Sequence, residues 1–313
     1  MTTPSSTDVT PKIIHQTWKT KDVPYPLSEY VLSVKKLNPG YEYKLWTDED
    51  IDELIKTQFP QYYTPYKQFQ QHIERVDFVR YAILYLYGGI YLDLDIECFK
   101  SLDPLVNKNR IILADEPLEH RKHLYKNRQH VLCNAMMISP EKQMFWIKVM
   151  NFIVQTYKRS SNPVYNTGPM MLTRFYEQDP GLFNQFDVLI LPSCSFFAQT
   201  DRYTKNTING IPYISNECIH NLKDAYAIHR WSHTWIDSYD EPIPPGTNID
   251  LTLPIINDND NKQDAKSGDK KKYASFWTTI KIILLILFVS YIYIRYVHLP
   301  IMATKIIQSN NKA

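Results

Sequence analysis

Two aspartates, Asp93 and Asp95, stand two residues apart at the end of an apolar run. Because successive side chains of a β-strand point to opposite faces, the apolar and polar alternation over 90–97 predicts that both carboxylates share one face. Their Cα atoms would be roughly 7 Å apart. Two carboxylates beside apolar residues are costly without a cation, and their oxygens suit Mg²⁺ or Mn²⁺. The pair therefore predicts a metal site for a diphosphate, although acidic pairs at this spacing also occur on solvated strand edges.

A helix and a glycine pair precede these aspartates and must position them. Apolar residues recur at helical spacing over 73–86, and the glycines at 88–89 end the helix and turn the chain into the strand. Glu74, Asp77 and Arg80 are three residues apart, so they line one helix face. An aspartate and an arginine at this spacing also form ordinary surface ion pairs.

The residues before this window predict the opening of an α/β domain. Strands are expected at 12–17 and 41–46, and helices at 28–37 and 47–59, the second of which begins with a Thr47–Asp50 capping box. Strand, helix, strand, helix is the start of a layered α/β fold.

The chain resembles glycosyltransferase family 32 over most of residues 11–237. The resemblance implies a GT-A fold, which is a Rossmann-like nucleotide-sugar domain, and transfer with retention of configuration. It is carried by six motifs in order: PKIIHQTW at 11–18, DxxRY at 77–81, GGIYLDLD at 88–95, NAMMISP at 134–140, NTGPMMLT at 166–173 and AIHRWSHTW at 227–235.

Residue roles follow from the resemblance. It implies that Asp93 and Asp95 contact the donor and a Mn²⁺ ion (or Mg²⁺), and that Asp77 and Arg80 contact the donor's sugar and phosphate. Trp18 matches an aromatic position that stacks on the nucleotide base, with a core tryptophan as the equal alternative. Further residues expected to bind the donor are Tyr91, Asn134, Gly168 and Trp235.

A late motif offers a third metal ligand. His229 and His233 both lie in it, and we favour His229 as the ligand over His233, with a packed core histidine as the alternative. The sequence suggests no convincing nucleophile. Asp115 and Glu116 follow a strand expected at 110–114, and a surface loop is the preferred interpretation for both.

Charge and cysteine content exclude some classes of partner and site. With 35 basic and 33 acidic residues the formal net charge is +2, so no nucleic-acid partner is expected. The cysteines Cys98, Cys133, Cys194 and Cys218 form no CxxC pair, and we expect buried reduced thiols rather than two disulfides.

The C-terminal part differs in composition. We expect residues 1–10 to be disordered and 11–240 to form the catalytic domain. Residues 241–272 are expected to form a polar, disordered linker, 276–297 to form a single transmembrane helix, and 298–313 to form a short tail. Since the N-terminus lacks the features of a secretory signal, we expect a membrane-anchored domain that faces the cytosol.

These observations predict a membrane-anchored, metal-dependent, retaining glycosyltransferase. It would transfer mannose, galactose or glucose from a GDP- or UDP-hexose to a lipid, glycan or protein hydroxyl. The alternatives are a non-catalytic nucleotide-sugar or glycan-binding module and a metal-dependent phosphohydrolase, which would need more carboxylate or histidine ligands.

Overall fold

A computed structural model describes residues 9–159, 162–201 and 214–234. The chain divides into two compact units, residues 1–249 and 250–313, and all described residues belong to the first. The predicted linker, transmembrane helix and tail lie outside the described residues. Within the described ranges, no helix combines the length and the apolar character that crossing a bilayer requires.

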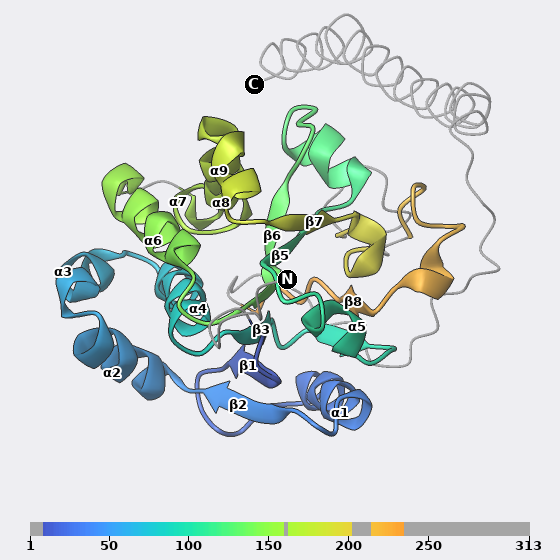
Figure 1. The fold of residues 1–313 in the computed structure, drawn as a ribbon, viewed down its shortest axis with the longest axis horizontal. Helices are drawn as coiled ribbons and strands as arrows, with labels where there is room; N and C mark the ends of the chain where they lie inside the picture. Colours follow the sequence, from blue (N-terminus) through green and yellow to red (C-terminus); the bar gives the residue numbers. More distant parts are fainter. Residues whose placement is uncertain (1–8, 160–161, 202–213, 235–313) are drawn as a thin grey trace, which may run out of the picture. The chain divides into compact units, whose positions relative to one another are not determined.

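Helices and strands are interspersed along the described chain (Figure 1). The strands are β1 (Ile13–Thr17), β2 (Glu42–Trp46), β3 (Gly89–Leu92), β4 (Ile96–Cys98), β5 (Ile112–Asp115), β6 (Leu132–Ser139), β7 (Leu189–Leu191) and β8 (Ala227–His229). The α-helices are α1 (Leu27–Leu37), α2 (Asp48–Gln58), α3 (Pro60–Gln68), α4 (His72–Tyr87), α5 (Asp103–Val106), α6 (Met144–Thr156), α7 (Pro163–Asn166), α8 (Pro169–Gln178) and α9 (Pro180–Gln185). A π-helical turn, η1 (His120–Leu124), and two 3₁₀ turns, η2 (Ser193–Ser195) and η3 (Leu222–Asp224), complete the set.

Six strands form a mixed central sheet in the order β2-β1-β3-β6-β5-β7. β1 runs parallel to β2 and β3, whereas β6 is antiparallel to both of its neighbours, β3 and β5. β4 and β8 pair antiparallel in a separate two-stranded sheet. This mixed sheet between helices confirms the predicted α/β class.

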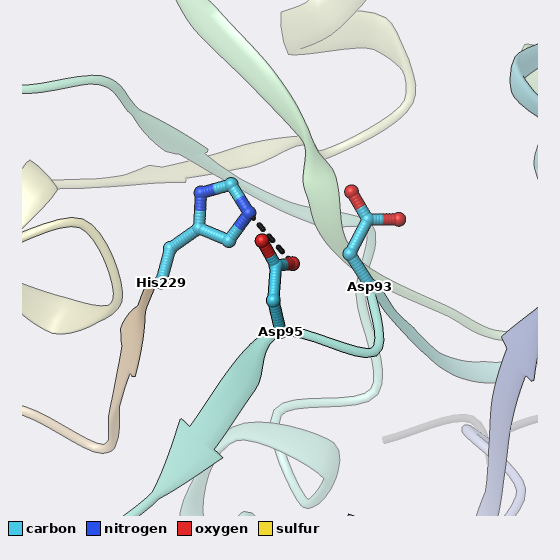
Figure 2. A group of neighbouring side chains, drawn as sticks. All are labelled: Asp93, Asp95 and His229. Carbon is cyan, nitrogen blue, oxygen red and sulfur yellow. Dashed lines mark hydrogen bonds and ion pairs between the residues drawn. The ribbon is translucent and has the colours of Figure 1, made fainter. Parts of the chain in front are cut away.

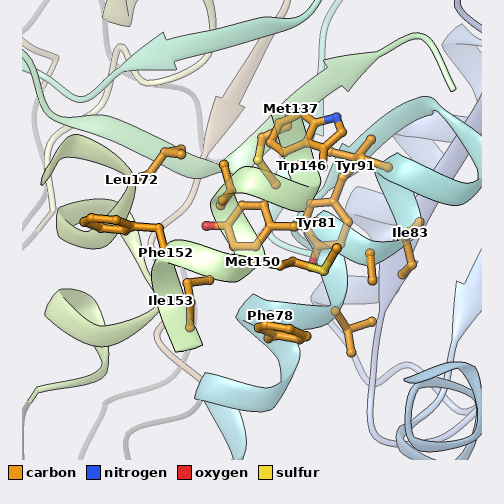
Figure 3. Close-up of a cluster of buried hydrophobic side chains, with 14 of the residues drawn as sticks. Phe78, Tyr81, Ile83, Tyr91, Met137, Trp146, Met150, Phe152, Ile153 and Leu172 are labelled. Carbon is orange, nitrogen blue, oxygen red and sulfur yellow. The ribbon is translucent and has the colours of Figure 1, made fainter. Parts of the chain in front are cut away.

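Apolar side chains cover both faces of the central sheet. On one face, residues of α2, α3, α4, α6 and α8 pack around the fully buried Trp146 and Tyr81, whose rings stack at 5.8 Å (Figure 3). On the other face, Ile90, Leu92 and Ile138 pack against residues of β4, α5 and β8. Two large apolar clusters on opposite sides hold the sheet rigid, and the ends of its strands carry the polar site described below.

The predicted elements near the N-terminus are present with small changes in their bounds. The capping box is confirmed: the Thr47 hydroxyl accepts from the Asp50 N–H, and the Asp50 carboxylate accepts from the Thr47 N–H. The expected glycine turn is also present, because Gly88 and Gly89 have φ of 60° and 84°. A Cβ on Gly89 would lie 2.5 Å from the Ile13 carbonyl oxygen, so only glycine lets β3 pass this close to β1.

One prediction about a strand is wrong. The run over 90–97 is not one strand: β3 ends at Leu92, and Asp93 to Asp95 form a turn in which the Ile96 N–H donates to the Asp93 carbonyl at 3.2 Å. The chain turns there because its continuation pairs with β8 instead of staying in the central sheet.

The cysteine prediction holds for only one pair. Cys98 and Cys133 are buried free thiols, but Cys194 and Cys218 form a disulfide. Their separation of 24 residues gave no sequence signal, since only the fold brings η2 beside the segment after 214.

Candidate metal and donor site

The turn between β3 and β4 brings together three metal-ligand side chains. Asp93 lies at its start and Asp95 at its end, where the strand pairing sets Ile96 opposite His229. Ligand atoms of Asp93, Asp95 and His229 all lie within 4.8 Å of one another, and Figure 2 shows the three side chains as neighbours, with His229 directed at Asp95. The structure thus places the sequence-predicted ligands in one group, on a turn rather than on a strand face.

Asp95 and His229 form a buried pair. Nε2 of His229 lies 3.0 Å from Oδ1 of Asp95, and the other carboxylate oxygen accepts the Ser232 backbone N–H at 2.7 Å. Burial alone would raise the pKa of Asp95, but His229 and the Ser232 N–H hold it well below its usual range. Burial alone would lower the pKa of His229, but the Asp95 carboxylate raises it. In the absence of metal, an imidazolium and a carboxylate therefore stabilise each other.

Arg80 connects the aspartates of α4 and of the turn. Its Nη2 lies 3.1 Å from Oδ1 of Asp77, and its Nη1 lies 3.3 Å from Oδ1 of Asp93. The guanidinium side chain is only 3% exposed, so these are desolvated ion pairs and not the surface pair that the spacing alone would suggest. Burial raises the pKa of Asp77 to about 6, while Arg80 and the Thr167 hydroxyl oppose that rise. Burial also raises the pKa of Asp93, against the effect of Arg80.

Asn134 supports Asp77 and Arg80 from β6. Its side-chain amide donates to Asp77 at 2.9 Å, and its backbone carbonyl accepts from Arg80 at 2.8 Å. The carbonyl is available because the register between β5 and β6 shifts at this point of the strand. Asn134 lines the cavity, but its amide nitrogen is committed to the protein network.

Tyr91 lies beneath the site and does not line the cavity. Its fully buried hydroxyl donates to Asp93 at 3.0 Å and pairs with the Thr17 hydroxyl, and the Arg80 guanidinium lies 4.7 Å from its ring centre. Its position supports Asp93 and Arg80 and offers no donor contact in this structure.

Asp77, Arg80, Asn134 and the three metal-ligand residues border one cavity of about 360 Å³, whereas Tyr91 and Thr167 do not line it. Trp18 follows β1 and lines the cavity as a half-buried ring, not as a core residue. Gly168 lines it too, and a Cβ there would lie 3.1 Å from the Val164 Cα and 3.5 Å from an Asp77 oxygen. His233 also borders the cavity but pairs with Asp201 at 3.0 Å. Trp235 lies outside the described residues.

The ligand set fits a divalent cation. Two carboxylates and an imidazole suit Mn²⁺, and carboxylates also suit Mg²⁺. Nδ1 of His229 is buried and finds no hydrogen-bond partner among the described residues, which is costly for a ring nitrogen and fits a residue that changes partners on binding. The three residues could therefore hold an ion. The side chain of Asp93, one of the two carboxylates, is 27% exposed.

One supporting residue was missed from the sequence: the Ser232 N–H fixes Asp95, but a serine does not signal such a role alone. Thr167 lies in the NTGPMMLT motif expected to border a sugar, and it donates its hydroxyl to Asp77 at 2.8 Å. The expectation of a surface loop for Asp115 and Glu116 is wrong, because they are only 7% and 1% exposed. Strand β5 extends one residue beyond its predicted end and carries both into the interior.

Comparison with known families matches this region. Residues 24–112 match the family described as "Glycosyltransferase sugar-binding region containing DXD motif", and the motif falls on Asp93 and Asp95. Residues 24–112 are therefore similar to a glycosyltransferase sugar-binding region. The sugar-binding region so identified confirms the resemblance to glycosyltransferase family 32 that the motifs indicated.

Several curated relatives carry the names of mannose-transferring enzymes. Inositol phosphoceramide mannosyltransferase 3 of Schizosaccharomyces pombe is 54% identical over 97 residues, which cover 31% of this chain and 27% of that protein. Mannosyl phosphorylinositol ceramide synthase SUR1 of Saccharomyces cerevisiae is 34% identical over 179 residues, which cover 56% of this chain and 44% of that protein. The chain thus spans less than half of the length of these relatives.

Likeness to solved structures is weaker. Mouse xyloside xylosyltransferase 1 shares 13% identity and a TM-score of 0.42, with 71% of this chain and 97% of that chain covered. The sheet order given above, and not this likeness, defines the fold.

Proposed function

We propose that this chain is a metal-dependent mannosyltransferase that transfers a hexose from a nucleotide sugar to inositol phosphoceramide. One observation carries the proposal: the two aspartates of the matched DXD motif and His229 converge on one cavity, although 134 residues separate Asp95 from His229. The mannosyl donor and the lipid acceptor come from the names of the similar proteins.

The metal-ligand residues would receive the donor's diphosphate. Asp93, Asp95 and His229 would hold a Mn²⁺ or Mg²⁺ ion, which when bound would neutralise the charge of the departing diphosphate. Arg80 orients Asp93 and opposes the rise of its pKa that burial causes, and both Nη atoms of Arg80 are already engaged by carboxylates and a carbonyl. Its role is therefore to position the site more than to reach the phosphates.

Trp18 is suited to the nucleotide base. Its ring lies at the cavity edge after β1, with the ammonium of Lys19 5.8 Å from its centre. A base can stack on such a ring whether it is guanine or uracil, so Trp18 does not select the nucleotide. Asp77 and Gly168, on the same cavity, would border the hexose.

Group transfer then needs only positioning and electrostatics. The oxygen of the acceptor hydroxyl forms a bond to C1 of the hexose, the bond from C1 to the diphosphate oxygen breaks, and its electron pair stays on the diphosphate. The hydroxyl proton passes to an oxygen of the departing phosphate. Attack on the face that the diphosphate leaves would retain the configuration at C1, without a protein nucleophile.

The disulfide bears on where the enzyme works. Structural disulfides persist in oxidising compartments and are rare in the cytosol of most organisms. The Cys194–Cys218 bond therefore favours a catalytic unit that faces a secretory lumen, in contrast to the cytosol-facing orientation expected from the sequence. Attachment to a membrane through 276–297 remains part of the proposal, because the acceptor of the similar proteins is a lipid.

The test uses the full chain in detergent with Mn²⁺, GDP-mannose or UDP-hexoses and inositol phosphoceramide micelles. Nucleoside diphosphate release and mannosylated lipid are measured for the wild type, Asp95→Asn and Asp103→Asn. Asp95→Asn should lose roughly 100- to 1,000-fold in turnover. Asp103→Asn is the matched control, because Asp103 forms an exposed ion pair with Lys12. The Asp103 side chain is 43% exposed.

The outcomes separate the competing functions. Donor binding without any release of nucleotide would indicate a binding module, and release of inorganic phosphate would indicate a phosphohydrolase. Turnover that survives in Asp95→Asn would contradict the proposed site.

A further inference from the structure

The cavity has a second group of buried polar residues, which the donor does not explain. Glu116, His120 and Asp201, here called the Glu116 wall, line the same cavity as the metal-ligand residues. They are only 1%, 1% and 6% exposed. Glu116 follows β5, His120 begins η1, and Asp201 follows the segment after η2.

Hydrogen bonds fix the protonation of His120. Its Nε2 accepts the backbone N–H of Asp201 at 2.8 Å, so this nitrogen carries no proton. The proton is therefore on Nδ1, which donates to Oε2 of Glu116 at 2.9 Å. Because both nitrogens of this neutral imidazole are hydrogen-bonded, it cannot give or take a proton without losing one of these bonds. Its function is therefore to hold the Glu116 carboxylate in place.

The carboxylate of Glu116 keeps one oxygen for a ligand. Its side chain is 2% exposed, it borders the cavity, and its Oε1 accepts no hydrogen bond from any described residue. Because Glu116 borders the cavity, a bound hydroxyl group can donate a hydrogen bond to this oxygen.

One aromatic ring connects the Glu116 wall with the metal-ligand residues. The Trp231 ring centre lies 4.7 Å from that of His120 and 4.2 Å from that of His229. The Trp231 backbone has φ of 52°, a left-handed conformation that non-glycine residues rarely adopt outside constrained sites. A ligand at Glu116 would thus lie beside the metal-ligand residues and within the same cavity.

The surrounding structure anchors this wall firmly. Glu119 accepts from the Ser215 hydroxyl at 2.7 Å and from the Asn216 N–H at 3.0 Å, and Glu217 pairs with Arg121 at 2.8 Å. The disulfide joins the segment that contains these partners to η2. Two carboxylates and a covalent bond therefore fix η1, and with it His120.

We propose that Glu116, held by neutral His120, binds ring hydroxyls of a polyol acceptor and so forms the acceptor subsite. This inference rests on the proposed transferase function. The ligand class follows from charge: an ionised carboxylate accepts hydrogen bonds from hydroxyls, whereas with Asp201 nearby it repels phosphate. A phosphate on the acceptor must therefore point away from this wall, while a neutral sugar or cyclitol ring faces it.

Glu116→Gln tests the free oxygen without removing the bond to His120. The amide oxygen of glutamine can still accept from Nδ1, while an NH₂ group replaces the free carboxylate oxygen. Asp115→Asn is the matched control: Asp115 is the preceding residue, also pairs with a histidine, His130, at 2.8 Å, and does not line the cavity.

Three measurements on the full chain with Mn²⁺ separate acceptor from donor effects: the KM for inositol phosphoceramide micelles, hydrolysis of the sugar donor without acceptor, and saturation-transfer NMR of free myo-inositol. Losing hydrogen bonds to a charged group should raise the acceptor KM of Glu116→Gln about 10- to 100-fold. Donor hydrolysis should stay within about twofold of the wild type, the NMR signal should fall, and Asp115→Asn should match the wild type in all three.

Other outcomes would overturn the acceptor subsite. An unchanged acceptor KM would do so, as would an equal loss of hydrolysis and transfer, which would assign Glu116 to the donor. Failure of the proposed function is distinct, since the wild type would then turn over no donor. In that case the NMR signal alone decides: loss of inositol binding in Glu116→Gln supports the subsite, and no binding by the wild type refutes it.

Discussion

The two sides of the cavity are built in different ways. Asp77, Arg80, Asp93 and Asp95, here called the DXD wall, come from a continuous stretch of 19 residues between α4 and β4. The Glu116 wall combines segments that are up to 85 residues apart, and a disulfide and further carboxylates secure it. The difference indicates that a local motif can organise donor chemistry, whereas the second wall depends on long-range packing.

Among substitutions that conserve charge, the largest effect is expected at Arg80, in the centre of the DXD wall. Arg80→Lys keeps the positive charge but loses the planar fork that contacts Asp77, Asp93 and the Asn134 carbonyl together. Turnover should fall about 100-fold, with roughly 1 to 3 kcal/mol lost in the free energy of unfolding. Donor kinetics and urea denaturation measure the two effects. Wild-type turnover in this variant would show that the ion pairs are not part of the site.

A smaller effect concerns metal affinity and pH. The pKa of His229 is raised, so His229 is protonated in the metal-free protein up to a higher pH than usual. Metal binding must displace that proton, so affinity should rise with pH by about tenfold per unit below this pKa and level off above it. Calorimetric titration with Mn²⁺ in buffers of different ionisation enthalpy measures both the slope and the proton released. Affinity independent of pH would exclude His229 as a ligand.

Removal of the disulfide should have the smallest effect on donor binding, and it tests whether the DXD wall and the Glu116 wall are independent. Replacing Cys194 and Cys218 by serine removes the bond that closes a loop of 24 residues, which should lower the free energy of unfolding by roughly 3 kcal/mol. Nucleotide binding at the DXD wall should change little, while the acceptor KM should rise because η1 is less firmly held. Thermal denaturation and the two KM values provide the measurements. An equal loss of donor and acceptor binding would show that the walls fold as one unit.

The sequence predicted the parts of the site that rest on local rules. Helical spacing placed Asp77 and Arg80 on one face of α4, and the glycine pair marked the turn into β3. The AIHRWSHTW motif supplied His229, favoured over His233, as a metal-ligand candidate. It did not predict the break after Leu92, because an alternating pattern looks the same whether the strand continues in one sheet or passes to another.

What the sequence by itself determined is therefore the α/β class, the DXD residues and the helix that faces them. These depend on periodicity and on neighbours within a few turns of chain. The tertiary structure alone decided that Asp95 meets His229 through the β4–β8 pairing and that Cys194 joins Cys218. It also decided that Glu116 is buried with one oxygen that accepts no hydrogen bond from a described residue. In each of these contacts, the residues next to one partner in the sequence do not indicate what the other partner is. The contact forms because packing across the whole sheet brings the two segments together.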